Sequence, residues 1–178
     1  MENAPGRVSR AVVALGANLG DAPRTLSQAV SDLAELGDVT AVSAVYRTRP
    51  IGPPQPDYLN AVAELRTGRS PRELLHGLQA IEGRHGRVRA ERFGPRTLDL
   101  DLIWFEGETS DDAELELPHP RAHEREFVLR PLCDIDGSLL LRGRPARDWL
   151  AEAAGQGVEP AGIDIGGQRR FPSARAET

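Results

Sequence analysis

The stretch at residues 94–102 reads GPRTLDLDL and constrains the fold more than any other part of the chain. Leu98, Leu100 and Leu102 alternate with Asp99 and Asp101, which is the period-two pattern of a strand with one apolar face. On such a strand the two aspartates project together, away from the leucines. Two carboxylates this close are costly unless a positive charge lies between them. The pattern therefore predicts a strand that carries a cation site on its polar face.

Arginines are concentrated just before this strand, at Arg84, Arg87, Arg89, Arg92 and Arg96. The whole chain has a formal net charge of −5, so the cluster is a local reversal of sign, and we expect no general attraction to nucleic acid or to an anionic membrane. Paired carboxylates beside arginines can hold a divalent metal and a polyphosphate together. The chain contains no lysine, which excludes the lysine-dependent phosphate loop and Schiff-base chemistry.

The length of 178 residues predicts a single domain, with a core over about residues 8–145 and a loosely ordered tail at 155–178. Cys133 is the only cysteine and lies among apolar residues, so we expect a buried thiol, no internal disulfide and a reducing, cytoplasmic location. No apolar run reaches the roughly 18 residues of a membrane span. The N-terminus also lacks the apolar core of a signal peptide.

Hydrophobic periodicity predicts four strands and two helices in the first 105 residues. The strands are expected at residues 8–15, 39–46, 58–66 and 98–105, and the helices at 22–36 and 70–83. The order β-α-β-β-α-β is that of the ferredoxin-like unit. We therefore expect an α+β fold with a four-stranded antiparallel sheet, both helices on one face, and C-terminal additions.

The remaining segments give weaker signals. Residues 16–20 are predicted to form a glycine turn, and 49–57 and 86–95 long loops. Residues 114–117 could pair at an edge. Residues 125–134 are predicted as a short apolar strand or turn that leads into a helix, and 147–154 as a final short helix.

Five sequence blocks occur in an order that resembles a known family: YRT at 46–48, QPDYLN at 55–60, GRVR at 86–89, GPRTLDLD at 94–101 and LPHP at 117–120. Over about residues 8–135 the chain is similar to the 6-hydroxymethyl-7,8-dihydropterin pyrophosphokinases of folate biosynthesis. The resemblance implies the ferredoxin-like fold that the order of elements suggests independently. It also implies a magnesium-dependent transfer of the β,γ-pyrophosphoryl unit of ATP to the pterin hydroxymethyl group, with release of AMP.

The resemblance assigns the metal and phosphate chemistry to the stretch at 87–101. Asp99 and Asp101 match the family's metal-binding pair, which implies two Mg²⁺ ions shared with the triphosphate. Arg96 matches a fixed phosphate contact. Arg87 and Arg89 lie in a glycine-flanked loop, and we expect them to swing in when ATP binds. These five side chains are the predicted catalytic set.

Four further residues match ATP contacts of the family. His119 lies between two prolines, and Arg125 stands two residues before Phe127. Gln79 and Glu82 stand one helical turn apart and match residues that face the nucleotide. The alternatives are a packed core histidine at 119 and ordinary polar helix surface at 79 and 82.

Six residues match the family's contacts with the flat pterin ring. Tyr58 and Phe127 match the aromatic pair that sandwiches the ring, although Phe127 could instead belong to the core. Asn60 can present both a donor and an acceptor to the pterin edge. Thr48 and Ile51 would contribute backbone groups from the proline-rich loop.

The sixth, Phe93, stands where the family commonly has Trp; it can still stack on the ring, but it lacks the indole N–H. Arg49 replaces a common proline beside Thr48, and residues 106–116 align too poorly to assign a site there. Glu114 falls where a basic ATP contact can occur.

Two other functions fit parts of the pattern. A two-aspartate nucleotidyltransferase would release pyrophosphate rather than AMP, and a ferredoxin-like ligand-sensing module would bind a small molecule without turning over ATP. The partners expected under the leading hypothesis are ATP and the dihydropterin, with no nucleic acid and no membrane. We expect the protein to be a monomer.

Overall fold

The computed structural model describes residues 6–50, 52–86 and 97–166. Its centre is a six-stranded sheet made of β1 (Ser9–Ala17), β2 (Asp38–Val42), β3 (Tyr46–Thr48), β4 (Tyr58–Thr67), β5 (Asp99–Phe105) and β10 (Val158–Pro160). The order across the sheet is β10-β3-β4-β1-β5, and β2 pairs with β4 as well. Each pairing is antiparallel. The predicted α+β class and ferredoxin-like order are confirmed.

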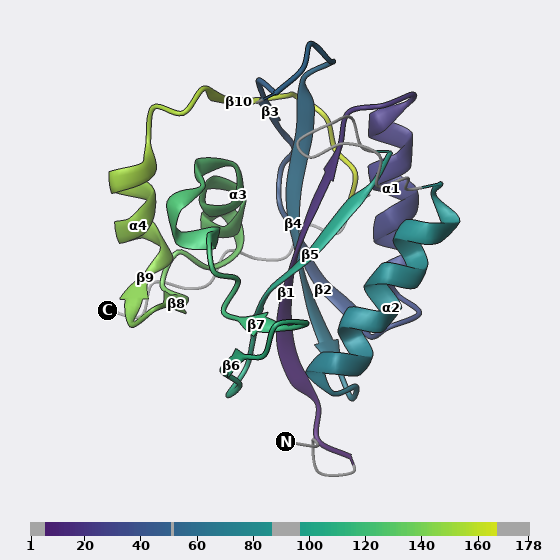
Figure 1. The fold of residues 1–178 in the computed structure, drawn as a ribbon, viewed down its shortest axis with the longest axis vertical. Helices are drawn as coiled ribbons and strands as arrows, with labels where there is room; N and C mark the ends of the chain where they lie inside the picture. The colour runs from purple at the N-terminus through teal and green to yellow at the C-terminus, as the bar shows by residue number, and fades with distance from the viewer. Residues whose placement is uncertain (1–5, 51, 87–96, 167–178) are drawn as a thin grey trace.

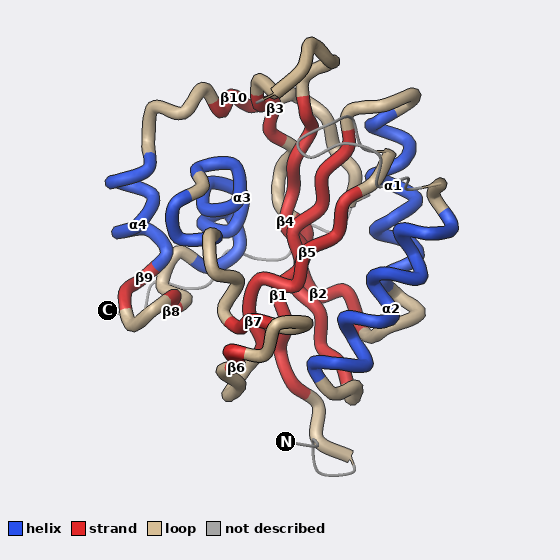
Figure 2. Tube along the Cα trace, in the orientation of Figure 1, coloured by secondary structure: helices blue, strands red, loops and turns tan. Residues whose placement is uncertain are grey.

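In the described part of the chain, four α-helices cover the sheet in two layers (Figures 1 and 2). Helices α1 (Ala22–Leu33) and α2 (Pro71–Arg84) pack on one face, as predicted, and α3 (Glu126–Asp136) and α4 (Ala146–Ala153) lie on the other side. Each layer encloses its own apolar core. None of the helices in the described part of the chain is long and apolar enough to cross a membrane.

Local sequence signals explain where the helices of the first layer begin. Helix α2 starts with Ser70, whose hydroxyl accepts a hydrogen bond from the Glu73 backbone N–H at 3.2 Å, and with Pro71 in its first turn. Helix α1 starts in the same way after Asp21. The apolar stripes of both helices then face the sheet, which buries Leu26 and Leu78 completely.

Short elements complete the chain. The edge pairing expected at residues 114–117 occurs, between β6 (Ser110–Asp111) and β7 (Glu116–Leu117). The 3₁₀ helix η1 (Ala122–Glu124) precedes α3, and β8 (Leu140–Leu141) pairs with β9 (Arg144–Pro145) before α4.

The strand predicted at residues 39–46 is in fact two strands, β2 and β3, separated at Ser43. The Ser43 hydroxyl accepts a hydrogen bond from the Val62 backbone N–H at 2.8 Å and donates to the Ala44 carbonyl at 2.8 Å. A side chain therefore takes the place of a backbone partner at this point of the sheet, so the strand is interrupted.

Residues 126–136 form a helix, so the strand or turn predicted at the start of this segment is wrong. A short apolar run cannot be assigned by periodicity alone. Its buried residues Val128, Leu129 and Leu132 fit one helical face, which packs on the sheet. The glycine turn predicted at 16–20 also begins later, because Gly16 and Ala17 belong to β1.

The tail expected to be loose from residue 155 is partly built into the sheet. Residues 158–160 form β10, which pairs with β3, and Ile165 is 4% exposed in the first core. Apolar residues spaced through a polar segment are a weak sequence signal for an ordered element. These residues find packing partners only because the segment docks on the sheet. Residues 167–178 of the predicted tail lie outside the described residues.

Candidate active site

One row of paired residues crosses the sheet and brings predicted site residues together. Asp99 of β5 pairs with Gly16 of β1, Gly16 pairs with Asn60 of β4, and Asn60 pairs with Tyr46 of β3. Residues opposite one another on neighbouring strands project from the same face of the sheet. Asp99 and Asn60 therefore share a face, with only a glycine between them.

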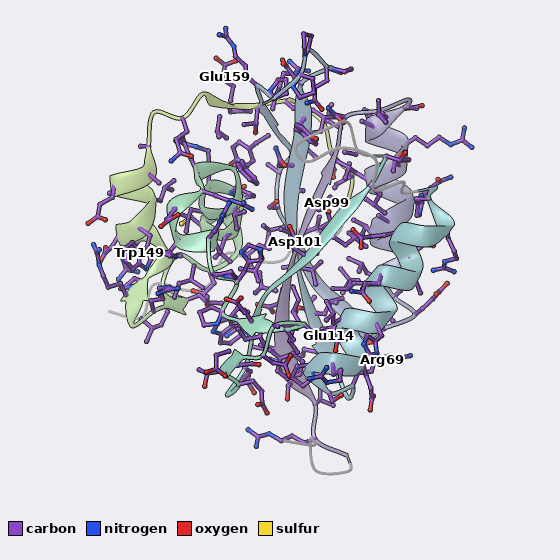
Figure 3. The ribbon with its side chains drawn as sticks, in the orientation of Figure 1. Arg69, Asp99, Asp101, Glu114, Trp149 and Glu159 are labelled. Carbon is purple, nitrogen blue, oxygen red and sulfur yellow. The ribbon has the colours of Figure 1, made fainter. Side chains whose placement is uncertain are left out.

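Alternation along β5 places both aspartates on that face. Leu98, Leu100 and Leu102 are each at most 4% exposed and pack in the core beneath α1 and α2. Asp99 and Asp101 are half-buried on the opposite face, near the centre of the molecule in Figure 3. The predicted arrangement of this strand is confirmed.

The two carboxylates fit a magnesium site that is completed by substrate. Mg²⁺ takes hard oxygen ligands and is commonly held by one or two carboxylates, with phosphate oxygens and water in the other positions. Within the described residues no group of three or more His, Cys, Asp or Glu side chains could enclose a metal ion. Asp99 and Asp101 would therefore hold the ion together with other oxygen ligands, such as phosphate and water.

His119 lies at the same site and is held in one orientation. Its backbone N–H donates to the Ile103 carbonyl at 2.8 Å, which fixes the segment after β7 against β5. Its Nδ1 accepts from the Arg121 backbone N–H at 3.2 Å, so the neutral ring carries its proton on Nε2. This proton is a hydrogen-bond donor suited to an anionic oxygen.

The electrostatic surroundings keep His119 neutral. Burial lowers its pKa to about 4, and the positive charge of Arg125 acts in the same direction. Asp99 raises the pKa and Arg121 lowers it, each by a smaller amount. The charges of Asp99 and Arg125 therefore both act on the His119 imidazole, in opposite directions.

The N-terminus of α3 carries Arg125 and Phe127. The guanidinium carbon of Arg125 lies 5.5 Å from the centre of the Phe127 ring. Phe127 is half-buried and packs against the second core, so part of the ring does serve the core, as the alternative interpretation held.

The loop after β3 is tied to the sheet by side-chain amides. The Asn60 Nδ2 donates to the Thr48 hydroxyl at 2.7 Å. The Asn18 Nδ2 donates to Gln55 Oε1 at 2.8 Å and to the Pro56 carbonyl at 2.9 Å, and the Gln55 oxygen also accepts from the Tyr58 hydroxyl at 3.3 Å. Sequence reasoning assigned no role to Asn18; its only signal is an amide that directly follows a buried strand.

Gly16 is a second residue that sequence reasoning missed. A Cβ atom at this position would lie 3.2 Å from Asn60 Oδ1 and 3.8 Å from the Leu59 carbonyl oxygen. The absent side chain therefore leaves the space between Asp99 and Asn60 open. A glycine inside a strand is the available sequence signal for such a close approach.

The two predicted nucleotide residues of α2 differ in environment. Gln79 is exposed, whereas Glu82 is 4% exposed. The Glu82 carboxylate accepts a hydrogen bond from the Leu100 backbone N–H at 3.0 Å. Glu82 therefore holds the short segment of β5 between the two aspartates. Ordinary polar helix surface, one alternative for this residue, is wrong because the carboxylate is buried against the strand.

Several predicted site residues lie outside the described residues: Ile51, Arg87, Arg89, Phe93 and Arg96. Arg84, at the end of α2, pairs with Glu35 of α1 at 2.9 Å.

A cavity of about 490 Å³ lies between the N-terminal part of α2 and the β6–β7 hairpin. Two of its lining residues, Arg72 and His76, pair with carboxylates of the hairpin. Arg72 pairs with Glu114 and, at 3.1 Å, with Asp112, and His76 Nε2 lies 2.6 Å from Glu114 Oε1. The hydrogen bond from His76 lowers the pKa of the exposed Glu114. Figure 3 shows Glu114 beside the lower part of α2.

Comparison with known proteins gives consistent matches. Residues 12–137 match the sequence model of the family 7,8-dihydro-6-hydroxymethylpterin-pyrophosphokinase. A 2-amino-4-hydroxy-6-hydroxymethyldihydropteridine pyrophosphokinase from Synechocystis sp. is 42% identical over 156 residues, covering 86% of this chain and 75% of that one. The protein of the same name from Pseudomonas aeruginosa is 44% identical over 157 residues, covering 85% and 96%.

The fold is shared with solved structures. Wild-type Plasmodium falciparum HPPK-DHPS superimposes with a TM-score of 0.63 at 13% identity, covering 82% of this chain and 44% of that one. The chain thus spans less than half the length of this two-part protein. Fold and matches together define an ATP-dependent transferase with a ferredoxin-like core. The chain belongs to the 7,8-dihydro-6-hydroxymethylpterin-pyrophosphokinase family.

Proposed function

We propose that this protein transfers the pyrophosphoryl group of ATP to the hydroxymethyl group of 6-hydroxymethyl-7,8-dihydropterin in folate biosynthesis, and releases AMP. The observation that carries the proposal is the row Asp99–Gly16–Asn60. It sets a carboxylate suited to metal and phosphate beside an amide suited to a heterocycle edge, on one face of the sheet. A phosphate donor and a flat acceptor held there would meet above Gly16.

In the phosphate half-site, bound metal ions and donor side chains would balance the negative charge of the triphosphate. Asp99 and Asp101 would hold two Mg²⁺ ions, which when bound supply charge neutralisation to the triphosphate. The Nε2–H of His119 and the guanidinium of Arg125 would donate to phosphate oxygens. Arg87, Arg89 and Arg96 are the further phosphate contacts that the family resemblance implies, and they remain predictions.

The nucleoside end of ATP would extend toward the cavity beside α2. His76 lines this cavity one helical turn before Gln79, and Leu117 lines it two residues before His119. Gln79 and His119 are not lining residues of this cavity themselves, but each lies within three residues of one along the chain. Its size is in the range of small-molecule sites.

The pterin half-site lies on the other side of Gly16. Asn60 presents its amide from β4, while Thr48 and Tyr58 face it from the ends of β3 and β4. Phe127 would stack on the ring from α3, opposite Tyr58. Ile51 and Phe93 would complete the enclosure.

The arrangement favours in-line transfer. The pterin hydroxyl oxygen would form a bond to the β-phosphorus as the bond from that phosphorus to the α,β-bridging oxygen breaks, and AMP leaves with the electron pair of that bond. One of the two aspartates would accept the hydrogen bond of the attacking hydroxyl and so orient it. Catalysis by positioning needs fixed groups, and β5 supplies them on a strand whose leucines are buried.

The proposal includes a monomer acting in the cytoplasm. A single, half-buried cysteine supports a reducing compartment, and both half-sites are built from one chain.

The decisive experiment identifies both products. The purified protein is incubated with ATP, MgCl₂ and 6-hydroxymethyl-7,8-dihydropterin. The nucleotide and pterin products are then separated and identified by mass spectrometry. We expect AMP and the pterin diphosphate in equal amounts, with turnover abolished by EDTA. ADP with a pterin monophosphate would contradict the proposal. Release of pyrophosphate would favour a nucleotidyltransferase, and binding without turnover a sensing module.

A further inference from the structure

The segment that follows α4 contacts the start of α3 and then continues to strand β3 of the sheet. This C-terminal strap, residues 154–166, runs past the N-terminus of α3, pairs with β3 as β10, and ends against the first core (Figure 1). It lies beyond the residues that match the family model. The strap connects α3, which carries Phe127, with β3, which carries Thr48, and both residues are predicted pterin contacts.

One end of the strap caps α3 through Gln156. The Gln156 Oε1 accepts from the Glu126 backbone N–H at 3.2 Å, and its Nε2 donates to the Glu124 carbonyl at 2.9 Å. The residue at the N-cap position, Arg125, makes no capping hydrogen bond with its own side chain. Gln156 thus satisfies a helix-end N–H that the helix itself leaves unpaired.

The Glu126 side chain strengthens this attachment. Its carboxylate is 2% exposed, accepts the Gln156 backbone N–H at 2.7 Å, and binds Arg130 Nη2 at 2.8 Å. A buried carboxylate is costly without such partners. The first turn of α3, which carries Arg125 and Phe127, is therefore fixed to the strap by both backbone and side chain.

The other end of the strap is fixed to β3. Val158 pairs with Thr48 and Pro160 with Tyr46, and the Ala161 N–H donates to the Val45 carbonyl at 2.9 Å. Beyond this point Ile165 is buried in the first core. Both ends are thus anchored, and the short path between Gln156 and Val158 sets how far α3 stands from β3.

We propose that the C-terminal strap fixes the gap in which the pterin ring is held, and that Gln156 is a positioning residue for pterin binding. This inference rests on the proposed function. A flat ring between Phe127 and Tyr58 needs a set separation between α3 and the strand edge. Gln156 sets this separation at the N-terminal end of α3. The middle and the C-terminal end of the helix are held by other contacts.

The test is a mutant cycle in the full-length enzyme between Gln156→Ala and Phe127→Ala. Pterin dissociation constants are measured by titration calorimetry, and KM for pterin and for ATP by initial rates. Loss of the Gln156 contacts should raise the pterin dissociation constant roughly three- to tenfold. If Gln156 acts through Phe127, the double variant should bind pterin no more weakly than Phe127→Ala alone.

Thr67→Val is the matched control. It removes two hydrogen bonds, to the Leu36 carbonyl at 2.7 Å and from the Arg69 N–H at 3.1 Å, at the end of β4 away from Asn60. It should lower stability and leave pterin binding unchanged. An equal loss of pterin binding in this control would show general loosening and overturn the inference.

The other outcomes separate this inference from the proposed function. Normal pterin binding by Gln156→Ala, with weakened binding by Phe127→Ala, overturns the inference alone, as do additive effects in the double variant. Normal binding by Phe127→Ala overturns both the inference and the predicted pterin site. The proposed reaction itself is judged separately, from the AMP that the unmodified enzyme forms.

Discussion

The Tyr46 hydroxyl donates to the Asp134 carboxylate at 2.8 Å and so joins β3 to α3 across 88 residues of sequence. Tyr46 is 8% exposed. Its burial, followed by the hydrogen bond to Asp134 and the charge of that carboxylate, raises the pKa of Tyr46 to about 12. The contact belongs to the same face of the sheet as the candidate active site.

Alkaline pH should destabilise the protein through Tyr46. Its folded-state pKa lies above the ordinary value of about 10, so between pH 10 and 12 the unfolded chain loses a proton that the folded protein keeps. The contribution is complete below pH 10 and is lost as pH rises toward 12, with a slope of at most about 1.4 kcal/mol per pH unit. We expect Tyr46→Phe to flatten this slope in urea denaturation followed from about pH 9 to 11.5.

The composition makes this measurement unusually clean. The chain has no lysine, so no ammonium group of that type titrates in the window. Tyr58→Phe, which changes the other tyrosine, is the control and should leave the slope in place. Burial also raises the pKa of the Cys133 thiol, so both variants are best compared in a Cys133→Ala background.

Neutralising either strand aspartate should stop the reaction without unfolding the protein. Asp99→Asn and Asp101→Asn keep the size of the side chain but remove the charge that a metal ion requires. We expect AMP formation to fall by roughly a hundredfold or more. Circular dichroism should show an unchanged fold. Asp148→Asn, on the exposed side of α4, is the control, and near-normal turnover in either strand variant would refute the metal assignment.

A methyl group at Gly16 should impair pterin binding more than ATP binding. It would lie 3.2 Å from Asn60 Oδ1 and force the amide to shift within the row that it shares with Asp99. For Gly16→Ala we expect the pterin KM to rise roughly three- to tenfold with a smaller change in the ATP KM. Gly68→Ala, where a Cβ meets nothing within 4 Å, is the control. Equal effects on both substrates would argue against a pterin site above Gly16.

Glu82 should act on stability through the β5 backbone. Glu82→Leu leaves the Leu100 N–H without its carboxylate acceptor in a buried position, which should cost about 1–3 kcal/mol in urea denaturation. Glu82→Gln retains an acceptor oxygen of similar shape and should cost less. Equal losses in the two variants would show that the negative charge, rather than the hydrogen bond to Leu100, is what matters.

Much of the fold was predictable because it is encoded locally. The alternation at 98–102 is read directly as one buried and one polar strand face, and Ser70-Pro71 marks the start of α2. Two of the segments that were predicted wrongly depend on a distant partner. Ser43 interrupts a strand because it bonds to Val62, and residues 158–160 become a strand because β3 offers a free edge.

The candidate site divides in the same way. Residue type and spacing pointed to Asp99 and Asp101, since carboxylates two apart stand out in sequence, and the family resemblance pointed to His119. Gly16 and Asn18 do not stand out, because their importance lies in contacts with Asn60 and Gln55 from other segments.

The sequence by itself determined the positions of helices α1 and α2 and of the strands that contain β1, β4 and β5, the shared face of the two aspartates and the resemblance to a pyrophosphokinase family. Each follows from residue pattern along a few positions. The tertiary structure alone decided that Glu82 is buried against Leu100, that Gln156 caps α3, and that Asp99 and Asn60 flank one glycine. These depend on strand register and helix docking, which bring together residues far apart in sequence and leave no local pattern to read.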